Sequence, residues 1–163
     1  MLFLCVKLYF DATVQPPRCA SYAIPPLRPQ NTCYSNANRQ SLFGLARTQC
    51  CSESVLAAEL CAIRSACILA ATNGWNNAFI ESDSRSAISL ASTEDVPPRA
   101  LAALICDIKF WKSQMNLHLC WTSRACNLAA HHVAKVAYVS DANFIWVDNF
   151  PCEITSIARR DAL

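Results

Sequence analysis

Glycine and charged residues are scarce in this chain, and each scarcity excludes some classes of protein. Gly44 and Gly74 are the two glycines among 163 residues, and neither belongs to a G-x-x-x-x-G-K phosphate loop or a G-x-S-x-G nucleophile elbow. The chain contains no H-E-x-x-H zinc motif either. A charged fraction of 16% argues against long disordered tails, and a net charge of +2 does not by itself indicate nucleic-acid binding.

Membrane and secretion signals are also missing from the sequence. No stretch approaches the roughly 20 consecutive apolar residues that cross a membrane. The apolar run at residues 1–6 lacks the basic start of a signal peptide, and Lys7 and Asp11 interrupt it. We therefore expect a protein that is not secreted, lies in the nucleus or the cytoplasm, and has no membrane partner.

The 11 cysteines do not form a recognisable binding or redox motif. Their number is odd, their spacing is irregular and no C-x-x-C pair occurs, which excludes zinc knuckles and thioredoxin-like sites. Four cysteines fall within helix or strand patterns, where small buried apolar residues are common: Cys61, Cys67, Cys106 and Cys120. We expect reduced intracellular thiols, with disulfides as the alternative.

A hydrophobic fraction of 53% is ample for one core, so we expect a single domain over 1–163, with its core at about 4–140 and a less defined tail at 141–163. Apolar periodicity and turn residues predict strands and helices in alternation. The predicted strands are 2–11, a proline-limited segment near 19–24, 41–47, 78–83 and 117–121. The predicted helices are 54–72, 84–91, 99–114 and 127–138. This order favours a mixed α/β sheet with helices packed on it.

Three acidic residues, Asp11, Glu59 and Asp83, lie against apolar segments. Asp11 and Asp83 each close a predicted strand. Glu59 lies about 60° from Leu56 and about 40° from Ile63 around the first long helix, on its core-facing flank. A buried carboxylate stays ionised only when a cation or hydrogen-bond donors hold it. A cluster of such groups is typical of a divalent metal site.

Four segments together resemble the type 1 ribonuclease H domain, most closely its plant reverse-transcriptase-like, retroelement-related branch. The segments are 6–13, 57–64, 79–84 and 124–135, in the order and at the spacing of that family. The resemblance extends from about residue 4 to the C-terminus. It implies an α/β, ribonuclease H-like fold, with a five-stranded mixed sheet and helices packed on both of its faces.

The resemblance also implies an activity and a site. Members hydrolyse the RNA strand of RNA–DNA hybrids with two Mg²⁺ or Mn²⁺ ions, and they use no small-molecule cofactor. Carried over by position, the catalytic residues are Asp11, Glu59, Asp83 and His131, of which the three acids are the metal ligands. We expect a monomer whose nucleic-acid contacts come from the residues beside these positions: Ser84, Arg85, Arg124 and Asn127.

The chain departs from the family at two places that bear on activity. His131 stands at the fourth acidic position, and imidazole is a poorer partner for Mg²⁺ than a carboxylate. Trp121 stands in the loop before the last helix, where other members place a mobile histidine. These departures leave two alternatives to an active ribonuclease. The first is a catalytically silent module that binds nucleic acid or a partner, and the second is a non-functional remnant that folds poorly.

Overall fold

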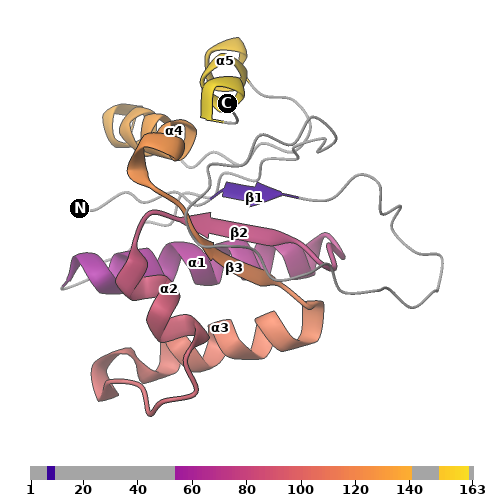
Figure 1. Cartoon of the computed structure of the whole chain (residues 1–163), viewed down its shortest axis with the longest axis vertical. Helices are drawn as coiled ribbons and strands as arrows, with labels where there is room; N and C mark the ends of the chain where they lie inside the picture. The colour runs from indigo at the N-terminus through magenta and orange to yellow at the C-terminus, as the bar shows by residue number, and fades with distance from the viewer. Residues whose placement is uncertain (1–6, 10–53, 141–150, 162–163) are drawn as a thin grey trace.

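The computed structural model describes residues 7–9, 54–140 and 151–161 (Figure 1). Its strands are β1 (Lys7–Tyr9), β2 (Phe79–Ser82) and β3 (His118–Trp121). Its α-helices are α1 (Val55–Thr72), α2 (Arg85–Ser92), α3 (Ala102–Met115), α4 (Leu128–Ser140) and α5 (Cys152–Asp161). Two short 3₁₀ helices, η1 (Arg99–Leu101) and η2 (Arg124–Cys126), precede α3 and α4.

The described strands form a mixed sheet in the order β1-β2-β3. β1 pairs antiparallel to β2, and β2 pairs parallel to β3 with Ser82 opposite Trp121. The mixed character agrees with the expectation from sequence. The predicted strands at 19–24 and 41–47 lie outside the described residues, so three strands of the expected five-stranded sheet are described.

The helices form two groups in Figure 1, and each group has its own core. α1, α2 and α3 pack on one another, and α1 and α2 also contact the sheet. Their shared core includes the fully buried side chains Leu60, Ile63, Cys67, Ile80, Ile105 and Ile108. α4 and α5 lie together at the other end of the view, past β1, and pack through a smaller cluster of Ala130, Val133 and Ile154.

Helix α1 agrees closely with the pattern in the sequence. The side chain of Ser54 caps its first turn by accepting a hydrogen bond from the backbone N–H of Ala57 at 3.1 Å. The helix ends at Asn73, and Gly74 follows with φ of 67°, a conformation that glycine adopts without strain. The apolar stripe predicted to face the core is fully buried at Leu60, Ile63, Cys67 and Ala70.

Two helical segments differ from the expectation. The predicted helix 99–114 begins, after Pro98, with the 3₁₀ turn η1, and the regular helix starts at Ala102. Helix α5 lies in the tail that the sequence left undefined. Its buried residues are Ile154 and Ala158, four positions apart, and they pack against α4. Two apolar residues are too few to predict a helix from the sequence of α5 alone.

The described cysteines agree only in part with the expectation of reduced thiols. Cys61, Cys67, Cys106, Cys120 and Cys152 are free. Cys67 is fully buried, and burial raises the pKa of its thiol to about 12, which keeps it protonated and unreactive. Cys126 is disulfide-bonded, which contradicts the expectation at that residue.

By length and composition alone, α1 could cross a membrane, and among the described helices it is the one that could. In the fold it occupies the place of a core helix, in contact with α2, α3 and β2. It carries a buried carboxylate, Glu59, and an arginine, Arg64, that reaches across to α3. The contacts of α1 with α2, α3 and β2 account for its apolar composition, because they bury its apolar side chains inside the core.

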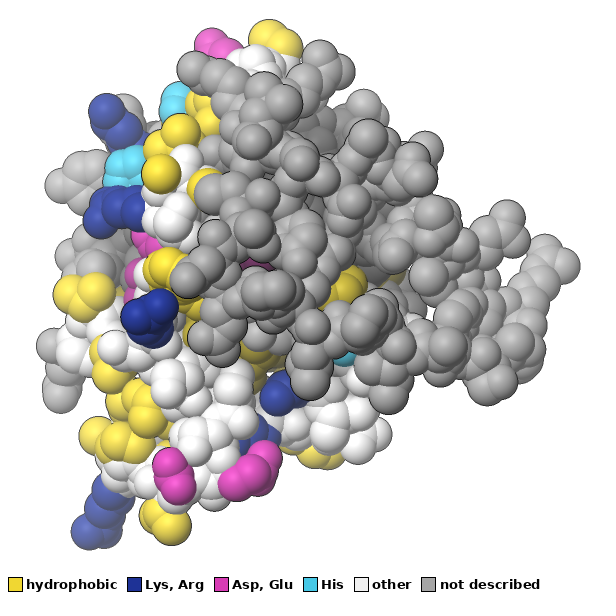
Figure 2. Space-filling view, in the orientation of Figure 1, with side chains coloured by type: hydrophobic (Ala, Val, Ile, Leu, Met, Phe, Trp, Pro, Cys, Tyr) yellow, Lys and Arg dark blue, Asp and Glu magenta, His cyan; other side chains and the backbone are white. Residues whose placement is uncertain are grey.

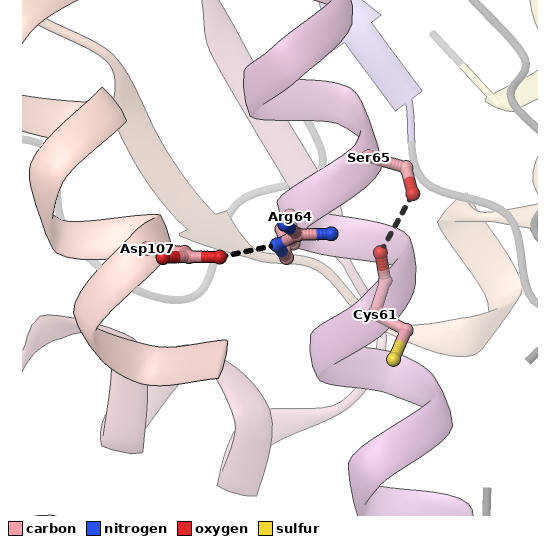
Figure 3. A network of polar contacts seen from close by, with 4 residues as sticks. All are labelled: Cys61, Arg64, Ser65 and Asp107. Atoms are coloured by element: carbon pink, nitrogen blue, oxygen red, sulfur yellow. Dashed lines mark hydrogen bonds and ion pairs between the residues drawn. The ribbon is translucent and has the colours of Figure 1, made fainter. Parts of the chain in front are cut away.

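An ion pair connects α1 to α3 at the surface (Figure 3). The Nε–H of Arg64 donates to Oδ2 of Asp107 at 2.7 Å, and the two side chains are 40% and 48% exposed. Because solvent screens charges at this exposure, such a pair contributes about 0–1 kcal/mol to stability. Packing of the apolar side chains beneath it supplies most of the attachment between the helices.

The fold predicts a large difference between two substitutions on these helices. Ile63→Ala leaves a cavity at a fully buried position and should lower the free energy of unfolding by about 2–5 kcal/mol. Asp107→Ala removes only the exposed ion pair and should cost about 1 kcal/mol or less. Urea denaturation followed by circular dichroism measures both. Equal losses in the two variants would contradict the assignment of the core.

Candidate functional site

The site is built around the carboxylate of Glu59, which points from α1 towards the end of β2. Its side chain is buried, with 7% exposure. Ser82 lies next to this carboxylate. Ser82 and Ile80 are two residues apart on β2, so both side chains lie on the buried face of the strand. The hydroxyl of Ser82 donates to Oε2 of Glu59 at 3.3 Å. The carboxylate is therefore hydrogen-bonded but largely removed from water.

Asp83 follows directly, in the bend between β2 and α2. Three hydrogen bonds hold this bend in place. The backbone N–H of Ser84 donates to Oγ of Ser82 at 3.1 Å, and that of Thr122 donates to the carbonyl of Ser82 at 3.0 Å. The indole Nε1–H of Trp121 donates to the carbonyl of Asp83 at 3.2 Å. Contacts from within the turn and from β3 thus fix the backbone that carries the second carboxylate.

Asp83 lies close enough to Glu59 to affect the ionisation of the Glu59 carboxylate. The pKa of Glu59 is raised to about 7, first because burial removes the hydration of its charged form and second because Asp83 repels that charge. The hydrogen bond from Ser82 and the positive charge of Arg124 lower the pKa by smaller amounts. The positive charge of Arg124 therefore offsets only part of the effect that burial and Asp83 have on the pKa of Glu59.

Arg124 interacts both with Glu59 and with His131. Its guanidinium acts on the charge of Glu59 on one side, and its Nη2 lies 3.5 Å from Nδ1 of His131 on the other. Both residues are exposed. Figure 2 shows histidine and basic side chains gathered over α4, where His131, His132 and Lys135 lie. Positive and titratable groups therefore border the acidic pair at this end of the molecule.

The residues expected to contact nucleic acid have different surroundings. Ser84 caps α2 by accepting a hydrogen bond from the N–H of Ala87 at 3.3 Å. Arg85 is exposed, and its guanidinium lies 4.6 Å from the centre of the Trp121 ring. Asn127 is 3% exposed, and no described residue provides a hydrogen bond to its Oδ1. Asn127 therefore lies beneath the surface at which we expected it to contact nucleic acid.

The structure thus brings together two of the four expected catalytic residues, Glu59 and Asp83. Asp11 lies outside the described residues, and His131 borders the pair through Arg124. Within the described ranges, no three His, Cys, Asp or Glu side chains gather closely enough to hold a metal ion. The pair still fits a divalent cation, because oxygen donors suit Mg²⁺ and a cation would offset both the burial and the repulsion by Asp83 that raise the pKa of Glu59.

Sequence reasoning missed Ser82 and the contacts of Trp121. Ser82 carried a signal: it is a polar residue at an inward position of a strand, directly before a candidate ligand. Trp121 is the last residue of β3, within the predicted strand 117–121, and it lies opposite Ser82. The parallel register moves its side chain to the Asp83 bend.

A family model described as reverse transcriptase-like matches residues 33–137, a range that contains Glu59, Asp83 and His131. No curated protein and no solved structure matches the chain.

The burial of Glu59 predicts how stability depends on pH. Its pKa of about 7 in the folded protein lies above the ordinary value of 4.5, so its stabilising contribution is complete below about pH 4.5 and is lost as the pH rises through 7. Between pH 5 and pH 8, wild type should lose up to about 3 kcal/mol of unfolding free energy relative to Glu59→Gln. Urea denaturation at the two pH values measures this difference.

The exposed residue Glu94 offers a matched control. Glu94→Gln should keep the pH dependence of wild type, because it removes a carboxylate that is already in water. If Glu59→Gln also kept that dependence, Glu59 would not be the group that titrates near neutral pH.

Proposed function

Because the chain belongs to the reverse transcriptase-like family, which is a ribonuclease H-like family, we propose that it hydrolyses the RNA strand of RNA–DNA hybrids with divalent metal ions. The observation that carries this proposal is the approach of Glu59 to Asp83 at the end of β2. Two segments that lie far apart in the sequence bring their carboxylates close enough to interact, although burying one of them destabilises its charged form. A bound cation would offset that cost.

The metal ligands in this proposal are Glu59, Asp83 and Asp11. When held by these residues, Mg²⁺ or Mn²⁺ would supply positive charge against the phosphodiester and would lower the pKa of a nearby water molecule. The residues of the chain prepare the site for this chemistry. Glu59 must lose its proton to bind a cation, and both the Ser82 hydroxyl and the charge of Arg124 favour its ionised form.

His131 has a different role in this proposal, because of its contact with Arg124. A guanidinium carries only donors, so a hydrogen bond at this contact requires Nδ1 of His131 to be the acceptor. A neutral imidazole then carries its proton on Nε2 and presents a donor instead of a ligand lone pair. We assign His131 to hydrogen bonding with a phosphate oxygen, beside the exposed charge of Arg124. Such contacts recognise the shape and backbone of a hybrid, not its base sequence.

One observation favours a second function, a catalytically silent module that binds nucleic acid. The described residues include two candidate ligands and a histidine at the position of the fourth acid. With too few carboxylates, the basic side chains over α4 would hold a nucleic acid without cutting it. The two functions differ in one measurable property, which is cleavage.

The proposal predicts that Asp83→Asn abolishes cleavage. Removing one negative ligand weakens metal binding by several kcal/mol in the transition state, so the rate should fall by about 100-fold or more. The measurement uses a labelled RNA–DNA hybrid in Mg²⁺ and in Mn²⁺. Asp95→Asn is the matched control, since Asp95 is exposed in the connection between α2 and α3 and should keep the wild-type rate.

Cleavage that survives in Asp83→Asn would remove this residue from the site. If folded wild type cut the hybrid in neither metal but bound it with a salt-dependent affinity in fluorescence anisotropy, the silent module would replace the ribonuclease.

A further inference from the structure

Trp121 connects three parts of the candidate site that the sequence keeps apart. It closes β3, its indole reaches the bend after β2, and its ring lies beneath the first residue of α2. The parallel register makes this possible, because Trp121 is the direct partner of Ser82, the residue before Asp83. The family match assigns no role to Trp121.

The hydrogen bond from Trp121 acts on the residue that carries the carboxylate. Nε1–H is the one polar group of the indole, and it donates to the carbonyl of Asp83 at 3.2 Å. The contacts of Ser82 fix the peptide bond before Asp83, and the N–H of Ser84 fixes the one after it. With its own carbonyl also held, the backbone of Asp83 cannot rotate freely, and the directions open to its carboxylate are restricted.

The ring of Trp121 is itself held from two sides. One side packs against the main core, where Trp121 is partly buried. The guanidinium of Arg85 lies over the ring at 4.6 Å from its centre, a cation–π contact. Arg85 is exposed, so the ring holds a positive charge at the surface beside the Asp83 bend. Different atoms of one side chain thus contact the backbone carbonyl of Asp83 and the guanidinium of Arg85.

We propose that Trp121 is a positioning residue with two separable actions: its indole N–H holds Asp83 for metal binding, and its ring holds Arg85 for contact with the nucleic-acid backbone. The inference rests on the proposed function. It names a residue that touches neither metal nor substrate and acts through its neighbours. Interactions of this kind, one step removed from the metal, change metal affinity or activity by about 10–100-fold when they are lost.

Three variants separate the two actions. Trp121→Phe keeps an aromatic ring and removes the N–H, so we expect about tenfold weaker Mn²⁺ binding and about tenfold lower kcat, with an unchanged KM for the hybrid. Arg85→Gln removes the stacked charge, so KM should rise several-fold while Mn²⁺ binding stays at the wild-type level. Trp121→Leu removes both the N–H and the ring and should combine the two effects.

The measurements are Mn²⁺ binding by calorimetry, steady-state cleavage of the hybrid, and urea denaturation of every variant. Trp111→Phe is the matched control, because Trp111 packs on the same core from α3. It should keep wild-type metal binding and kinetics. If Trp121→Phe fails to fold, benzothienylalanine at position 121 replaces it, since this analogue keeps the shape of the indole and exchanges the N–H for sulfur.

The outcomes distinguish this inference from the proposed function. If wild type binds Mn²⁺ and cuts the hybrid, but loss of the indole N–H changes neither, the inference is overturned and the function stands. If folded wild type neither binds Mn²⁺ nor cuts, the proposed function fails and the inference falls with it. Weaker metal binding at constant KM, absent from Trp111→Phe, supports the inference.

Discussion

The hydrogen bond between Ser82 and Glu59 joins α1 to the end of β2 inside the core, and the rest of the site is arranged around it. A carboxylate in this position loses most of its hydration, so its neighbours decide whether it is ionised. Asp83 disfavours the charge, whereas Ser82 and Arg124 favour it. The opposing effects leave Glu59 near the midpoint of its titration at neutral pH, which is where small changes in surroundings alter its protonation most.

Local patterns in the sequence predicted the parts of the site that depend on one element at a time. The 3.6-residue period placed Glu59 on the core-facing flank of α1, and the structure confirms its burial. The alternation of 79–83 placed Asp83 at the end of a strand, and β2 ends one residue before it. Helix and strand bounds agreed within a few residues wherever strong apolar periodicity and a cap occurred together.

Features that depend on pairing between elements were not predictable in the same way. The contact of Trp121 with Asp83 spans 38 residues and exists only because β2 and β3 are parallel and in one particular register. A strand pattern shows which residues face inwards but not which strand lies beside it. Helix α5 was missed for a related reason, since its two buried residues have meaning only against α4. Asp11 lies outside the described residues, so its predicted place beside Glu59 and Asp83 stays a prediction.

The composition of α1 has a consequence for the synthesis of the protein. Its 18 residues include two charged side chains, Glu59 and Arg64, and its buried face is covered by β2 and α3, which come later in the chain. At about 5–20 residues per second, the ribosome needs roughly 2–9 s to add the stretch from the end of α1 to the end of α3. During that interval α1 is without its contacts to α3, whereas β2 and α2 are made earlier and can already cover part of it. Early packing of β2 and α2 onto α1, or binding by chaperones, would limit aggregation of a newly made chain.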